Sequence, residues 1–247
     1  MFDWQAEALV PFDELMLPED ADEELMRDFT NPALIPKSSL LLYGPPGTGK
    51  SALCKAIAAE RTGAKSLKEL DELTHIYDLK DRKVAQSISQ DLLMNTVNLG
   101  RFYEHGHIFI FDELDELTEG QMKELTAFIN SYNRLGEGGA IFATTNVDVD
   151  DRTSLRKMGV AGGALLDRFE YKELMDHQHL KDFLPLIHRK LMEHDIQIDD
   201  ADILTLAAAE NLEPFSRVSI RQVRAFVLKI GRQIVKERKR SSLAYSS

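Results

Sequence analysis

The chain has very little cysteine and no long apolar run. Among its 247 residues only Cys54 is a cysteine, so no disulfide can form within the chain. The disulfide frameworks of small secreted domains are therefore excluded. No apolar stretch approaches the roughly 18 residues that a bilayer-spanning helix needs, and residues 1–5 lack the basic start of a secretory signal. We therefore expect a cytoplasmic protein without membrane contact.

Basic side chains are outnumbered by acidic ones, 30 against 41, and they are unevenly placed. The net charge is −11, and residues 1–36 carry ten acidic side chains against one base, Arg27. An acidic protein binds nucleic acid poorly in a nonspecific way, although a local basic patch can still hold phosphates. Near the end of the chain, basic residues cluster on the last predicted helix. They could form such a patch, or they could simply stabilise the negative end of the helix dipole. These residues are Arg232, Lys236, Arg238, Lys239 and Arg240.

A glycine-rich loop stands out against these absences. Residues 44–51 have the pattern G-x-x-x-x-G-K-S, between the apolar run 39–43 and the helix-forming segment 52–59. Backbone N–H groups of such a loop, and the start of the following helix, surround a phosphate. Lys50 is expected to reach the β- and γ-phosphates, and the Ser51 hydroxyl to bind Mg²⁺. The residues expected to contact a nucleoside triphosphate are Gly44, Pro45, Pro46, Gly47, Thr48, Gly49, Lys50, Ser51 and Ala52.

The hydrophobic pattern predicts an α/β domain followed by a helical one. Strands are expected at 39–43, 74–79, 107–111 and 140–145, alternating with helices at 50–61, 84–104 and 119–134. Such alternation is typical of a parallel sheet covered on both faces. A short helix and an edge strand are expected within 164–171, and only helices after residue 176, at 180–193, 201–211 and 219–240. The resulting division is an acidic lead-in (1–37), an α/β domain (38–175), an all-helical domain (176–240) and a disordered tail (241–247).

Acidic residues follow the strand 107–111. Asp112 and Glu113 lie at its carboxyl end, where ligands bind in open parallel sheets. We expect Asp112 to hold Mg²⁺ and Glu113 to act as the base that polarises the attacking water. Asp115 and Glu116 repeat the pair, but the first pair is preferred because it directly follows the apolar strand.

Asn146 follows the strand 140–145. Its amide can bridge a water molecule and the γ-phosphate through hydrogen bonds, which would give it a catalytic role. An asparagine at this position serves equally well in a turn, so the residue pattern alone leaves both interpretations open.

Five segments in order resemble the motifs of the AAA+ ATPases. Residues 44–51, 108–113, 144–146, 165–169 and 219–221 resemble the Walker A, Walker B, sensor 1, arginine-finger and sensor 2 motifs. Residues 11–15 resemble the segment that folds over adenine. The resemblance implies a P-loop fold with a parallel sheet flanked by helices and a small all-helical lid. It also implies ATP and Mg²⁺ as ligands and a homo-oligomer, expected to be a hexameric ring.

The resemblance implies roles for two arginines. Arg168 would be the arginine finger that reaches the γ-phosphate bound to the adjacent subunit, and Arg221 the lid residue that contacts the γ-phosphate in its own subunit. Arginine suits both roles because it stays charged and binds phosphate through a planar fork. The alternative for Arg168 is an ion pair with Asp167 or Glu170. For Arg221 the competing lid positions are Arg217 and Arg224.

Three functions fit the sequence. The preferred one is an ATPase that remodels a macromolecular partner. A nucleic-acid motor, helicase loader or transposition regulator is favoured by Lys80, Arg82 and Lys83, in a segment that lacks the aromatic–hydrophobic–glycine loop of protein-unfolding members. A slowly hydrolysing, nucleotide-dependent scaffold is the third. DNA binding that weakens steeply with salt would identify the nucleic-acid motor. The sequence leaves open whether the client is protein or nucleic acid.

Overall fold

In a computed structural model the chain forms two compact units, Ala8–Met175 and Asp176–Ser247. The structure describes residues 9–19, 21–98, 106–135 and 139–244. The first unit contains a parallel sheet and is called the α/β unit below. The second is mostly helical and is called the helical unit.

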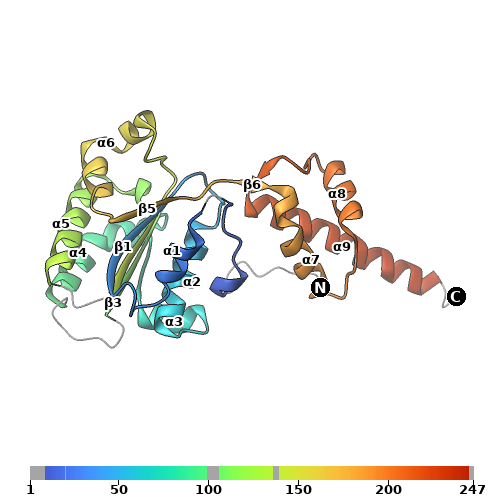
Figure 1. The fold of residues 1–247 in the computed structure, drawn as a ribbon, viewed down its shortest axis with the longest axis horizontal. Helices are drawn as coiled ribbons and strands as arrows, with labels where there is room; N and C mark the ends of the chain where they lie inside the picture. Colours follow the sequence, from blue (N-terminus) through green and yellow to red (C-terminus); the bar gives the residue numbers. More distant parts are fainter. Residues whose placement is uncertain (1–8, 20, 99–105, 136–138, 245–247) are drawn as a thin grey trace. The chain divides into compact units, whose positions relative to one another are not determined.

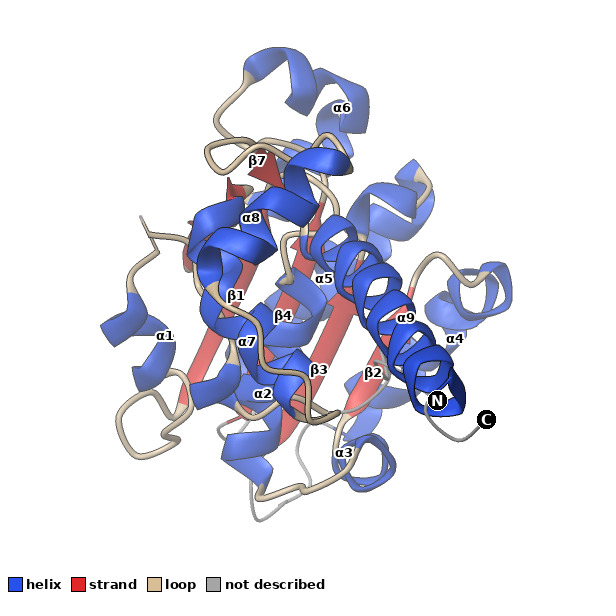
Figure 2. Cartoon of the chain, turned by 90° about the vertical axis from the view of Figure 1, so that its right-hand side faces the viewer, coloured by secondary structure: helices blue, strands red, loops and turns tan. Residues whose placement is uncertain are grey.

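The sheet of the α/β unit has five parallel strands in the order β2-β3-β4-β1-β5. Figure 2 shows four of them, β1, β4, β3 and β2, side by side. The predicted α/β class with a parallel sheet is confirmed. The strands are β1 (Lys37–Tyr43), β2 (His75–Asp78), β3 (His107–Asp112), β4 (Gly139–Thr145) and β5 (Tyr171–Leu174).

The central strands are apolar along nearly their whole length because both faces of the sheet are covered. β3 and β4 are buried at nearly every position, as is typical of parallel strands under two helical layers. In register, Tyr43 of β1 lies opposite Thr145 of β4, and Phe111 of β3 lies opposite Ala143. The carboxyl ends of these strands therefore lie at one edge of the sheet, and the polar residues that follow them are brought together.

Helices cover the two faces of the sheet in two groups (Figure 1). Two separate clusters of buried apolar side chains, one on each face, hold these layers to the sheet. One face carries α1 (Glu23–Asp28), α2 (Lys50–Thr62) and α3 (Leu67–Leu73). The other face carries α4 (Arg82–Asn98), α5 (Glu119–Leu135) and α6 (Arg152–Leu166).

Helix α6 is the main departure from the predicted elements. A short helix was expected from residue 164, whereas α6 begins at Arg152, where the Asp151 side chain accepts hydrogen bonds from the backbone N–H groups of Thr153 and Ser154. The helix is kinked at Gly159, which has φ 69° and ψ −169°. This break interrupts the helical period of the apolar residues, which explains why the pattern did not reveal the helix. The edge strand lies at Tyr171–Leu174 and so begins at the last residue of the expected range.

The lead-in belongs to the α/β unit over its described part. From residue 9 onward the lead-in falls within this unit, and Phe12, in the 3₁₀ turn η1 (Phe12–Glu14), is buried in the apolar cluster that joins α1, α2 and α3 to the sheet. The expected extension of α4 to residue 104 lies outside the described residues.

The helical unit contains η3 (Leu180–Phe183), α7 (Leu184–Met192), α8 (Asp200–Ala209) and α9 (Ile220–Ala244). The expectation of helices alone is wrong in one detail, because β6 (Gln178–His179) pairs antiparallel with β7 (Arg217–Val218). Strands of two residues are too short to show an alternating pattern. Helix α9 extends to Ala244 and so includes residues that were expected to be disordered. Among the described residues, no helix is both long and apolar enough to cross a membrane.

Candidate nucleotide-binding site

The loop between β1 and α2 requires glycine at defined positions. Gly44, Gly47 and Gly49 have φ values of 122°, 82° and 96°, which L side chains rarely adopt. At Gly44 the restriction is also steric, because a Cβ there would lie 2.5 Å from the carbonyl oxygen of Met175. Gly49 is the N-cap of α2, so the loop leads directly into the positive end of that helix.

Lys50 turns its ammonium back onto the loop. Its Nζ donates hydrogen bonds to the carbonyl oxygens of Gly44 and Pro45, both at 2.8 Å, and to Oδ1 of Asn146 at 3.2 Å. The residue is only 5% exposed, which is unusual for lysine unless polar groups surround the charge. The structure therefore brings together Lys50 and Asn146, two residues that the sequence assigned to catalysis.

Ser51 and Asp112 form the second part of the cluster. The Ser51 hydroxyl donates to Oδ1 of Asp112 at 2.6 Å, and the Thr144 hydroxyl donates to the same oxygen at 2.5 Å. The Thr144 oxygen in turn accepts the backbone N–H of Glu113 at 2.9 Å. Thr144 thus orients the Asp112 carboxylate and the following residue together. The sequence assigned Thr144 to a motif but gave it no role of its own.

Glu113 lies at a sharp turn after β3. Its φ of 67° is left-handed, which is uncommon for a residue with a side chain. It is 8% exposed, and its carboxylate forms an ion pair with Lys80 in the loop after β2. The other carboxylate oxygen, Oε2, has no hydrogen-bond partner among the described residues. Lys80 therefore contacts the predicted base, whereas the sequence grouped it with Arg82 and Lys83 as a basic loop.

Tyr43 and Asp150 join the end of β1 to the loop after β4. The phenol donates to Oδ2 of Asp150 at 2.5 Å. Burial, followed by the hydrogen bond to this carboxylate, raises the pKa of Tyr43. The phenol consequently remains a donor throughout the physiological pH range and connects two segments that border the site. Sequence reasoning did not identify this contact.

Arg168 is exposed just after α6. Among the described residues its side chain makes no hydrogen bond or ion pair, and the alternative pairing with Asp167 or Glu170 is not formed. Asp167 instead lies 3.6 Å from Lys172. The structure of one chain does not bring the Arg168 side chain into contact with the loop residues.

The lid arginines differ in their surroundings within the helical unit. Arg217 forms an ion pair with Asp176, and Arg224 is half-buried on α9. Arg221 is exposed in the first turn of α9, and no hydrogen bond or ion pair of its side chain is found in the described part of the chain. Of the three candidates, Arg221 is the one whose guanidinium is not already engaged with a protein group or half-buried.

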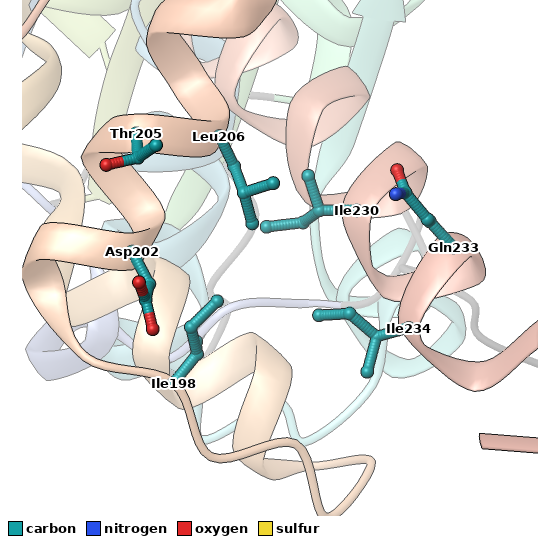
Figure 3. Close-up of a pocket in the computed structure, with 7 residues that line it drawn as sticks. All are labelled: Ile198, Asp202, Thr205, Leu206, Ile230, Gln233 and Ile234. Carbon is teal, nitrogen blue, oxygen red and sulfur yellow. The ribbon is translucent and has the colours of Figure 1, made fainter. Parts of the chain in front are cut away.

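A separate pocket lies in the helical unit, between α8 and α9 (Figure 3). Ile198, Leu206, Ile230 and Ile234 supply an apolar lining, and its polar members are Asp202, Thr205 and Gln233. This set holds one titratable side chain and no nucleophile with an adjacent base. The groups suited to phosphate chemistry lie instead at the edge of the sheet.

Comparison with known proteins agrees with this geometry. The family model described as "ATPase family associated with various cellular activities (AAA)" matches residues 40–160, the span that contains the loop, Asp112, Glu113 and Asn146. Proteasome-activating nucleotidase 1 of Halobacterium salinarum is 30% identical over 162 residues, which cover 58% of this chain and 37% of that protein. The chain belongs to the AAA+ ATPases.

Further relatives match a larger share of this chain at equal or lower identity. The 26S proteasome regulatory subunit 10B homolog A of Arabidopsis thaliana is 30% identical over 74% of this chain and 45% of that protein. Spastin of Drosophila erecta is 25% identical over 84% of this chain and 29% of that protein. The chain spans less than half the length of these curated relatives.

Solved structures show the same P-loop fold. Domain III of the Thermotoga maritima replication initiation protein DnaA aligns with a TM-score of 0.60 at 15% identity, over 93% of this chain and 89% of that one. The Aeropyrum pernix ORC1 protein in complex with DNA gives 0.61 at 19% identity, over 90% and 62%. At these identities the AAA+ fold is shared, and nothing about clients follows from the likeness.

Proposed function

We propose that the chain binds ATP with Mg²⁺, hydrolyses the β–γ anhydride bond and uses this cycle, as a subunit of a homo-oligomeric ring, to remodel a macromolecule. The observation that carries the proposal is the hydrogen-bonded cluster at the carboxyl edge of the sheet. Lys50 donates to Asn146 at 3.2 Å, and Ser51, the next residue, donates to Asp112 at 2.6 Å. Thr144 joins the Asp112 carboxylate to the backbone N–H of Glu113.

The residues suit their proposed ligands. Ser51 and Asp112 present a hydroxyl and a carboxylate oxygen 2.6 Å apart, and Mg²⁺ prefers such hard oxygen ligands. A Mg²⁺ ion held by these two oxygens would neutralise charge on the triphosphate. The ammonium of Lys50 and the backbone N–H groups of the glycine-rich loop supply the remaining positive potential.

Glu113 is the proposed base for the attacking water. The water oxygen forms a bond to the γ-phosphorus, the bond to the bridging oxygen breaks, and the water proton moves to the Glu113 carboxylate. The products are ADP and inorganic phosphate. Asn146 is proposed to orient the water, because its amide lies beside Lys50.

The ion pair of Lys80 with Glu113 predicts an effect on basal turnover. Lys80→Met should raise the steady-state rate about two- to fivefold, because the half-exposed Lys80 ammonium no longer competes with water for the buried carboxylate. Phosphate release at saturating ATP measures the rate. Lys83→Met is the matched control, since no ion pair of its side chain is found among the described residues. A lower rate in Lys80→Met would show that the pair supports catalysis, and an unchanged rate would show that it does not limit turnover; either result contradicts the prediction.

Arg168 is proposed to act across subunits, since its exposed side chain makes no contact with the site in its own chain. Arg168→Ala and Glu113→Gln should each be inactive alone. Mixed in equal amounts, they should recover about a quarter of the wild-type rate, because in a ring of head-to-tail contacts one interface in four joins an intact base to an intact arginine. Phosphate release after subunit exchange measures this.

The mixing experiment also tests the ring. Arg156→Ala, which removes an exposed arginine within α6, should keep its activity without mixing. If the mixture of Arg168→Ala and Glu113→Gln stays inactive although native mass spectrometry shows oligomers that contain both variants, the finger is another residue.

A polypeptide client is favoured over nucleic acid. The net charge is −11, and one base of the segment 80–83 is engaged with Glu113 rather than available to a phosphate backbone. Curated relatives at 30% identity include a proteasome-activating nucleotidase and a proteasome regulatory subunit. These observations support a protein-remodelling ATPase, with the nucleic-acid motor and the slow scaffold as the alternatives.

A further inference from the structure

We infer that Asp115 is a positioning residue that holds the Asn146 amide with its oxygen toward Lys50. The inference rests on the proposed function, because it concerns the same site. Asp115 is not part of the Asp-Glu pair that directly follows β3, and nothing in the motifs gives it a task. In the structure its carboxylate nevertheless accepts three hydrogen bonds from the end of β4.

The backbone turn at Glu113 explains how Asp115 reaches β4. The left-handed φ of Glu113 is followed by the 3₁₀ turn η2 (Leu114–Glu116), which is closed by the Glu116 N–H donating to the Glu113 carbonyl oxygen at 3.0 Å. Leu114 is fully buried and anchors this turn under the sheet edge. Asp115 is thereby directed to the residues that follow the neighbouring strand.

The three contacts of Asp115 divide between backbone and side chain. Oδ1 accepts the Thr145 hydroxyl and the Asn146 backbone N–H, both at 2.9 Å. Oδ2 accepts Nδ2 of Asn146 at 3.3 Å. The first two contacts hold the backbone at the end of β4, and the third acts on the side chain of Asn146 alone.

Opposite charges determine which way the amide faces. On one side Nδ2 of Asn146 donates a hydrogen bond to the Asp115 carboxylate. On the other side Oδ1 of Asn146 accepts a hydrogen bond from the Lys50 ammonium at 3.2 Å. Rotation of the amide by 180° would place its oxygen against the carboxylate and its NH₂ group against the ammonium, so both contacts would become repulsive. Asp115 and Lys50 therefore favour the same orientation, which puts the amide oxygen beside the phosphate-binding lysine.

Asp115→Asn tests the role with little change in shape. The new side chain keeps an oxygen for the Thr145 hydroxyl and the backbone N–H, but its NH₂ group then faces Nδ2 of Asn146, another donor. We expect kcat to fall about tenfold, as for loss of an oriented polar contact at a reaction centre. Affinity for a non-hydrolysable ATP analogue should change less than about threefold, because Lys50 is retained. Glu116→Gln, an exposed neighbour, is the control.

A double-mutant cycle separates positioning from support of the backbone. Asn146→Ala should lower kcat by a similar factor, and Asp115→Asn combined with Asn146→Ala should be no worse than Asn146→Ala alone. If the two losses multiply, Asp115 acts through the backbone and the inference is wrong. Wild-type kcat in Asp115→Asn would also overturn it. Absence of hydrolysis by the wild-type chain would instead refute the proposed function.

An exchange of the two groups provides a second test should Asp115→Asn fail to fold. Asn146→Asp puts two carboxylates together and should be nearly inactive. Asp115→Asn with Asn146→Asp restores the hydrogen bond with donor and acceptor reversed, and its kcat should exceed that of Asn146→Asp severalfold. Equal rates in these two variants would contradict the inference.

Discussion

Lys50→Ala is expected to weaken ATP binding at least about 100-fold, because it removes a charged donor to the phosphates from a largely water-excluded position. The side chain is 5% exposed, and its ammonium lies among the Gly44 and Pro45 carbonyl oxygens and the Asn146 amide. Titration with a fluorescent ATP analogue in the presence of Mg²⁺ measures the affinity. Lys55→Ala, on the same helix α2, is the matched control and should bind within about twofold of the wild type.

Thermal unfolding separates loss of binding from loss of the fold. A ligand that binds only the native state raises the Tm, so ATP with Mg²⁺ should stabilise the wild type and Lys55→Ala. Lys50→Ala should unfold cooperatively without showing this rise. A variant that is still stabilised by ATP would mean that the phosphates bind elsewhere.

Glu113→Gln should retain ATP binding and lose at least about 100-fold in kcat, the usual contribution of a general base. The amide is nearly isosteric with the carboxylate, and the backbone N–H of Glu113 still donates to the Thr144 hydroxyl, so the turn and the orientation of Asp112 are kept. The amide nitrogen, however, does not accept a proton from water. Glu116→Gln, three residues further along, should remain active.

The ion pair with Lys80 adds a second consequence of Glu113→Gln. The substitution also removes the negative charge that pairs with Lys80. Because the site then carries one negative charge less, affinity for the anionic ATP should be unchanged or slightly higher. If Glu113→Gln keeps the wild-type rate, the proton acceptor is another group, and Asp115 or Glu116 would be the next carboxylates to replace.

Much of the fold follows from patterns that lie close together in the chain. β1, β3 and β4 could be located because strands buried on both faces are continuous apolar runs bounded by polar residues. Helix α6 could not, since Gly159 breaks its helical period, and the β6–β7 pair is too short to carry any period. The first failure comes from a local backbone kink, and the second from a pairing of residues about 40 positions apart in the sequence.

The candidate site also has a part that the sequence predicts and a part that it does not. Lys50, Ser51, Asp112, Glu113 and Asn146 could be predicted as neighbours because the carboxyl ends of adjacent parallel strands share one edge. The contacts of Thr144, Asp115 and Lys80 could not be predicted, because each depends on where the backbone turns after a strand. The left-handed turn at Glu113, which a glutamate rarely adopts, has no signal in the residue pattern.

The measurement that tests the central claim most directly is single-turnover release of γ-phosphate with enzyme in excess over labelled ATP and Mg²⁺, for the wild type and Glu113→Gln side by side. The account predicts release by the wild type and retention of intact ATP by Glu113→Gln, with equal amounts of nucleotide bound. Equal release by the two proteins, or no release by the wild type at any protein concentration, would contradict it.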